Sequence, residues 1–302
     1  MKNVTRVLVM VCVLAVSNMF GQATQQEVQF QTVENNLSKQ EVKNHYLLAD
    51  KVYLRDCAST LCARRGKLDI GTKLTVLEKD IQTETLDGIT SSWYKVKTDA
   101  EIGWLWGGFI AQKAFGSEAN GNIKFVFGAA GVQVNEDGVL EKTYQIRAFR
   151  NDTQIRKFVF ASNEEIDAEK VMSIGNKGVT NVSDIIKLHI PCEENKSQSG
   201  DTYVFWSGNR FYEVATLKGS KTEIADAYEE FIFPSDMNGE RNMIIRKSSK
   251  VADSEYEGYE DDKIERVATS VFLKWDGTAL VKTVKEPVVV NYEIKIDELA
   301  LN

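Results

Sequence analysis

The chain has 302 residues, of which 43% are hydrophobic, 27% are charged and only three are proline. This length predicts two domains with hydrophobic cores of their own, and the scarcity of proline excludes a rigid proline-rich stalk. The formal charge of -7 argues against nucleic acid or another polyanion as the main partner and favours a cationic or neutral one.

The first 23 residues have the three parts of a secretory signal. A positive start (Lys2, Arg6) is followed by the apolar run 7–16 and by the small-x-small site Gly21-Gln22-Ala23. The apolar run is about half as long as a membrane-spanning helix, so we expect cleavage near Ala23 and no membrane span. The mature protein is then periplasmic or extracellular, and loss of the two cations changes its formal charge from -7 to -9.

Residues 24–44 are polar without a core face and are predicted to form a leader. From residue 45 to residue 112, apolar and polar side chains alternate in short runs, which is typical of a small antiparallel barrel. The strands predicted there are 51–55, 67–70, 73–79, 92–97 and 101–106. Asp87-Gly88 is predicted to lie in the loop between the third and the fourth of these strands.

Three cysteines remain after cleavage: Cys57, Cys62 and Cys192. Because an exported protein enters an oxidising compartment, and Cys57 and Cys62 lie close together in a predicted turn, a disulfide between them is favoured. The alternative is a pair of reduced, half-buried thiols, since pairing cannot be read from sequence alone. Cys192 is interpreted as a small buried hydrophobic residue.

Residues 113–122 are small and polar, and we predict that they link the first module to a β-rich domain at residues 123–302. The strands predicted in that domain are 123–127, 142–149, 155–160, 184–190, 202–206, 210–217, 242–246, 267–275, 279–284 and 288–296. Two short helices are predicted at 163–172 and 222–231 from their polar starts and mixed apolar spacing. A loose repeat of hairpins, with turns at 207–208 and 276–277, favours a sandwich slightly over propeller-like hairpin repeats.

Five segments within residues 45–112 follow one another in a specific order. They are Val52-Tyr53-Leu54-Arg55, Asp56-Cys57-Ala58-Ser59-Thr60, Gly71-Thr72-Lys73-Leu74-Thr75-Val76-Leu77, Trp93-Tyr94-Lys95-Val96, and Ile102-Gly103-Trp104-Leu105 with Phe109-Ile110. In this order they resemble the strands and loops of the bacterial SH3 (SH3b) family. The chain departs from that family where Cys57-Ala58 replaces a Gly-Pro pair and where the loop 80–91 is longer than usual. The fold class that follows is mainly β, with a small SH3-like barrel followed by a larger antiparallel β domain.

Resemblance to this family implies extracytoplasmic binding of a cell-wall peptide or a protein segment in an aromatic-lined groove. The candidate contact residues are Tyr53, Trp93, Tyr94, Trp104 and Trp106. A barrel this small cannot bury five large aromatic side chains completely. Strand alternation puts Trp104 and Trp106 on one face, which is either the core or an exposed surface. Because Trp93 and Trp104 occupy motif positions that can belong to the core, Tyr53, Tyr94 and Trp106 are the preferred contacts.

The chain contains two histidines, His45 and His189, and no motif that pairs a nucleophile with a histidine base. We therefore predict a protein that is not an enzyme and needs no cofactor. Asp236, Asn238 and Glu240 resemble part of a calcium loop, but a full oxygen shell needs more carboxylates, so a plain turn is favoured. The acidic run 253–262 is interpreted as a solvated loop.

The leading hypothesis is an exported binding protein whose first module recognises a cell-wall peptide or a protein segment. One alternative is a glycan-acting enzyme whose second domain holds two carboxyl groups about 5 to 9 Å apart in a cleft. The other is a structural subunit of an envelope complex, which predicts a large flat apolar patch.

Overall fold

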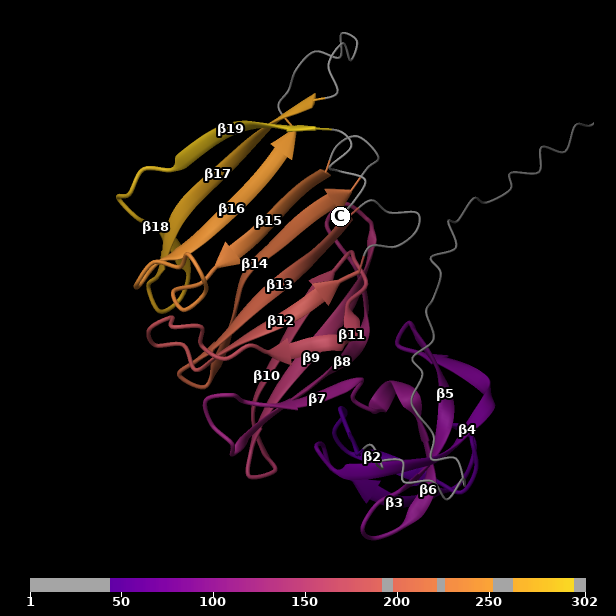
Figure 1. Ribbon diagram of the computed structural model, residues 1–302. Coiled ribbons are helices and arrows are strands. Elements are labelled where there is room, and N and C mark those ends of the chain that lie inside the picture. The colour runs from indigo at the N-terminus through magenta and orange to yellow at the C-terminus, as the bar shows by residue number, and fades with distance from the viewer. Residues whose placement is uncertain (1–43, 192–197, 222–225, 252–262, 296–302) are drawn as a thin grey trace, which may run out of the picture.

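The computed structural model describes residues 44–191, 198–221, 226–251 and 263–295, and these residues are folded almost entirely as antiparallel β-sheet (Figure 1). The prediction of a mainly β fold is therefore confirmed. Among the residues described, no helix is long and apolar enough to cross a membrane. The predicted signal, the leader up to residue 43, Cys192 and the acidic run 253–262 lie outside the described residues.

The N-terminal module, residues 45–112, is a curled six-stranded sheet in the order β1-β4-β5-β6-β2-β3. Its elements are β1 His45–Tyr46, β2 Val52–Arg55, β3 Arg64–Leu68, β4 Lys73–Leu86, β5 Ile89–Lys97, β6 Ile102–Trp106 and the 3-10 turn η1 Gly107–Phe109. Alternate side chains of β2, β4, β5 and β6 point inward, and they bury one compact core that includes Leu54, Val76 and Leu105. The β4–β5 hairpin extends through the region predicted as a loop, and Asp87-Gly88 forms its turn with positive φ angles of 51° and 77°.

A four-stranded sheet follows, in the order β10-β9-β8-β7. Its strands are β7 Lys113–Gly116, β8 Ile123–Val134, β9 Leu140–Arg150 and β10 Thr153–Ser162. Residues 113–116, which fall in the predicted linker, thus belong to the sheet. The reason is visible in the sequence of β7, where Lys113 and Phe115 alternate with small residues and pair with β8.

A nine-stranded sheet follows, and each of its strands pairs antiparallel with its neighbour (Figure 1). Its strands are β11 Asp167–Ser173, β12 Asp184–Ile190, β13 Gln198–Ser207, β14 Arg210–Lys221, β15 Asp226–Ile232, β16 Ile244–Val251, β17 Lys263–Trp275, β18 Leu280–Lys282 and β19 Val288–Lys295. The sheet runs continuously from β11 to β18, with β19 beside β17, rather than dividing into propeller-like blades.

Two cores lie on opposite faces of this long sheet because successive residues of β12 and β13 point to opposite sides. On one face, Ile186, Val204 and Trp206 pack with Phe125 and Ile146 of the four-stranded sheet, which makes a sandwich. The other face carries a second core, which includes Ile185, Phe205, Leu217, Phe231, Ile244 and Trp275. The sheet curls around this second core, so the domain is part sandwich and part half-barrel.

The two predicted helices are wrong. Residues 167–173 form β11 and residues 226–232 form β15, while 222–225 lie outside the described residues. Their mixed apolar spacing reflects strands that bury one face each: Val171 packs in the sandwich core and Phe231 in the half-barrel core. β14 pairs with the first two residues of β15, and β16 pairs with residues 228–232, and this pairing overrides a weak local preference for helix.

The N-terminal module docks directly on the four-stranded sheet. Leu48 and Ala111 of the module pack with Val126 and Phe149 of the sheet, and all four side chains are buried. Gln112 N–H also donates to the carbonyl of Phe127, 2.9 Å away. We call this small apolar cluster the junction core.

Candidate functional site

The pairing of β5 with β6 decides which aromatic side chains of the N-terminal module face outward. Trp93 and Trp106 are direct cross-strand partners, and so are Tyr94 and Leu105. Because partners share a face and neighbours alternate, Trp93 and Trp106 point away from the core while Tyr94 and Leu105 point into it. Tyr94 is accordingly fully buried in the module core.

The outward face carries a pocket of about 230 Å³, which we call the aromatic pocket. Tyr53, Trp93, Trp106 and Phe109 supply its rings, and residues 49–52 form part of its wall. Tyr53 is 38% exposed and alternates with the buried Val52 and Leu54 on β2, so strand geometry places it at the surface. Trp93 and Trp106 line the pocket but retain only 4% and 2% exposure, so each offers less accessible aromatic surface than Tyr53.

Hydrogen bonds hold both indole rings in place. Trp93 Nε1 donates to Glu84 Oε2 at 2.8 Å, and Trp106 Nε1 donates to the carbonyls of Glu84 (2.9 Å) and Ser91 (3.1 Å). Phe109 packs edge-on against Trp106, with ring centroids 5.1 Å apart. Since both indole N–H groups are already satisfied, the pocket offers a ligand a preformed apolar surface rather than hydrogen-bond donors.

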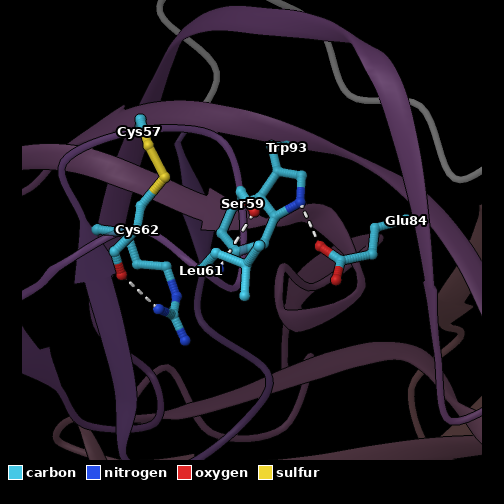
Figure 2. The surroundings of a disulfide bond; sticks show 7 residues. Cys57, Ser59, Leu61, Cys62, Glu84 and Trp93 are labelled. Atoms are coloured by element: carbon cyan, nitrogen blue, oxygen red, sulfur yellow. Dashed lines mark hydrogen bonds between the residues drawn. A yellow bond between two sulfur atoms is a disulfide. The ribbon is translucent and has the colours of Figure 1, made fainter.

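The predicted disulfide joins Cys57 to Cys62 beside this pocket, with the two Cα atoms 5.6 Å apart (Figure 2). The loop that it closes carries Thr60, which lines the pocket and donates from Oγ1 to Glu84 Oε1 at 2.9 Å. Arg55 Nη1 donates to the carbonyl of Cys62 at 2.7 Å. The disulfide loop is therefore tied to β2 through Arg55 and to the β4–β5 hairpin through Glu84.

Replacing both Cys57 and Cys62 by serine is expected to lower the free energy of unfolding by about 2 kcal/mol, the entropy value for so short a loop. Urea unfolding of the oxidised wild-type protein and of the double variant measures the difference. With a reductant present, the wild-type midpoint should fall to that of the variant, and the variant should not change. Equal midpoints under oxidising conditions would show that the disulfide adds no stability.

The pocket has a mildly basic mouth. Among its lining residues, Lys51 and Arg55 carry positive charge and Asp50 carries negative charge. Just outside, the Arg64 guanidinium carbon lies 4.8 Å from the centre of the Tyr53 ring. This local surplus of positive charge contrasts with the negative charge of the whole chain, and it favours a ligand with an acidic group beside its apolar part.

The five predicted contact residues thus separate into two groups. Tyr53, Trp93 and Trp106 come together in the aromatic pocket, whereas Tyr94 and Trp104 do not line it. Tyr94 has to be corrected as a preferred contact, because its inward position on β5 leaves no exposed surface. Trp104 is half-buried on the outward face, where the Lys95 ammonium lies 5.9 Å from its ring centre.

Sequence reasoning misses Leu86 and Phe109, which line the pocket, and Glu84, which lies outside the lining and holds the two indole rings. Glu84 and Leu86 fall in the segment 80–91, which has no counterpart of that length in the SH3b pattern. No sequence signal marks Glu84, because its role depends on a hairpin that brings it within hydrogen-bond distance of Trp93, Trp106 and Thr60. Phe109 occupies the closing position of the SH3b-like match, for which the resemblance implies only the end of the barrel.

The predicted weak metal candidates form a turn whose charges are already paired. Asp236 accepts from Lys177 Nζ at 3.0 Å and from the backbone N–H of Phe233 at 2.9 Å. Glu240 is paired with Lys285. Both carboxylates are thus held by protein partners, and a calcium ion would have to displace Lys177 and Lys285. Asp56, Cys57 and Cys62 also lie close together, but the two sulfur atoms are joined to each other and cannot act as thiolate ligands.

No family model, no curated protein and no solved structure matches this chain.

Proposed function

We propose that the protein is an exported, non-enzymatic binding protein and that its N-terminal module, of the bacterial SH3 type, holds a cell-wall peptide in the aromatic pocket. The observation that carries the proposal is the preformed pocket itself. Four aromatic rings meet at one outward site, and Glu84 fixes two of them before any ligand arrives. Such preorganisation reduces the entropy lost on binding.

The ligand chemistry that suits this pocket is a short apolar side chain next to a carboxylate. A volume of about 230 Å³ admits a side chain rather than a whole folded partner. Lys51 and Arg55 line the pocket and provide the positive charge for the carboxylate. A peptide stem of the cell wall carries free carboxylates beside small apolar side chains, and it therefore fits both requirements.

Substitution of Tyr53 by alanine is expected to weaken binding to isolated peptidoglycan about tenfold, as loss of a central aromatic contact does in many interfaces. Co-sedimentation of the whole mature protein measures the bound fraction. The matched control is Ile81→Ala, because Ile81 is 95% exposed on β4 and lies outside the pocket. Equal binding by both variants would remove the pocket from the binding site, and no binding by the wild-type protein would leave a protein segment as the ligand.

A second candidate function, a structural subunit of an envelope complex, is favoured by the edge strand β19. Val288, Val289 and Val290 are each about half exposed, and β19 pairs only with β17 among the described residues. An apolar strand edge is a template for pairing with another strand. The partner that we propose is β19 of a second copy, since antiparallel pairing of a strand with itself gives a closed two-fold dimer.

For this second candidate, sedimentation velocity is expected to give a dimer for the wild-type protein and a monomer for Val289→Lys. A charged side chain at the paired edge would have to be buried without a partner, which opposes association. Val139→Lys makes the same change at an exposed position in the β8–β9 turn, away from β19, and should remain dimeric. A monomeric wild-type protein would contradict the assembly.

A further inference from the structure

A second cavity lies at one end of the half-barrel, far along the chain from the N-terminal module. Its volume is about 670 Å³, within the roughly 300 to 1,000 Å³ of small-molecule sites. Its lining includes Asn181, Asn242, Ile244, Trp275, Asp276 and Val281. These residues come from the loop before β12, the loop before β16, and the β17–β18 hairpin. We call it the half-barrel cavity.

The two loops that wall this cavity are fixed to each other. Ser235 N–H donates to the carbonyl of Lys177 at 3.1 Å, and Lys177 Nζ donates to Asp236 Oδ1 at 3.0 Å. Gly178 packs so closely on Pro234 that a Cβ atom there would lie 3.1 Å from the proline Cβ. The turn around Asp236 therefore holds the loop before β12 against the loop before β16 and fixes this part of the cavity wall.

Trp275 contributes an unusual polar group to this region. Its residue exposure is 7%, and its Nε1 has no hydrogen-bond partner among the residues described. Its ring packs edge-on against Phe205 and Tyr212, with centroid distances of 5.1 and 5.4 Å. A buried N–H group without an acceptor is costly and rare, and this one is closed off from solvent at the wall of the cavity.

The polar side chains that line the cavity include both hydrogen-bond acceptors and hydrogen-bond donors. Asp276 Oδ1 accepts from the backbone N–H groups of Thr278 (2.7 Å) and Ala279 (2.8 Å), and these bonds hold the pKa of its carboxyl below the usual range. The carboxylate adds hydrogen-bond acceptors to the cavity wall. Asn181 and Asn242 add amides that both donate and accept, and each has a positive φ, 64° and 61°. Lys274 balances the charge of Asp276, so the lining is neutral as a whole.

We propose that the half-barrel cavity binds a neutral saccharide of one or two rings. Sugar hydroxyls donate and accept at once, which matches a wall of amides and a carboxylate, and the C–H faces of a sugar suit the apolar surface of Trp275, Ile244 and Val281. The balanced charge of the lining disfavours an ionic ligand. Asp276 is the one carboxylate among the lining residues, so the cavity suits binding rather than hydrolysis by two carboxyl groups.

The test uses the whole mature protein with three neutral disaccharides: maltose, cellobiose and N,N′-diacetylchitobiose. Titrations up to millimolar sugar follow the indole N–H resonances in a proton–nitrogen NMR spectrum, in which Trp275→Phe identifies the Trp275 signal. We expect at least one sugar to shift that signal and to leave the signals of Trp93 and Trp106 unchanged. No shift with any of the three sugars would overturn the proposal.

The matched variants keep the backbone conformation of the wall. Asn181→Gly combined with Asn242→Gly removes both amides while glycine accepts the positive φ, and the affinity for the sugar is expected to fall at least about tenfold. Asn163→Ala, an exposed asparagine outside the cavity, should bind as the wild-type protein does. Equal affinity of all three proteins would place the sugar elsewhere and overturn the proposal. Tyr53→Ala should bind the sugar normally, which keeps this test separate from the peptidoglycan test.

Discussion

Replacement of Asp184 by alanine is expected to lower the free energy of unfolding by roughly 3 to 5 kcal/mol, the range for breaking a buried charged network. The Asp184 side chain is fully buried at the start of β12. It accepts hydrogen bonds from Ser117 Oγ (2.5 Å), Ser173 Oγ (2.7 Å) and the backbone N–H of Glu118 (2.8 Å). Alanine would leave these three donors without their acceptor inside the protein, and each unsatisfied donor costs about 1 to 3 kcal/mol.

Urea unfolding followed by tryptophan fluorescence measures this loss. Asp184→Asn should be intermediate, because the amide oxygen still accepts while its NH₂ group faces donors. The control is Asp137→Ala, since Asp137 is exposed in the β8–β9 turn and its change should stay within about 0.5 kcal/mol. If Asp184→Ala and Asp137→Ala unfold at the same urea concentration, the network does not stabilise the fold.

Asp184 also illustrates what the sequence could not reveal. Ser117 and Glu118 lie in the segment predicted as a linker, and their small polar character is what that prediction used. Only the docking of β7 beside β8 brings them to the start of β12, 66 residues further along the chain. The same residues that look like a linker in the sequence are therefore one anchor of the domain.

The alternation of apolar and polar residues was sufficient to predict three strands of the N-terminal module. The predicted strands 51–55, 92–97 and 101–106 overlap β2, β5 and β6 closely, because one buried face gives a clear period of two. The same pattern fails to say which face is inward when both contain aromatic residues. Trp93 and Tyr94 are adjacent and equally suited to a core, and only the pairing with Trp106 and Leu105 shows that Tyr94 is the buried one.

The sequence was enough to predict that aromatic side chains line the candidate site. It was not enough to predict the hydrogen bonds that hold these side chains in place. Three of the five predicted aromatic residues do line one pocket, although only Tyr53 of these three is exposed, and Trp93 and Trp106 are nearly buried. The contribution of Glu84 could not be predicted, because it rests on three contacts with residues 9 to 24 positions away in the chain. Such contacts depend on the length and twist of the β4–β5 hairpin, which no short motif encodes.

Replacement of Phe149 by alanine is expected to separate the unfolding of the N-terminal module from that of the rest of the protein. The Phe149 ring is fully buried in the junction core, where it packs with Leu48, Ala111 and Val126. It also fits against Gly71 of the module, where a Cβ atom would lie only 2.5 Å from the ring. Truncation of a buried phenylalanine costs about 3 to 5 kcal/mol, and here most of that loss falls on the contact between the two parts.

Differential scanning calorimetry is expected to show one transition for the wild-type protein and two for Phe149→Ala, because two units unfold together only while their interface is strong enough to couple them. Phe127→Ala is the matched control: Phe127 is equally buried, but it lies in the sandwich core, within one unit. The Phe127→Ala variant should melt at a lower temperature than the wild-type protein. The lost stability should come from the sandwich core of the β-rich domain and not from the contact with the N-terminal module. A single transition for Phe149→Ala would mean that the backbone bond from Gln112 to Phe127 and the neighbouring contacts of β7 couple the units without the aromatic ring.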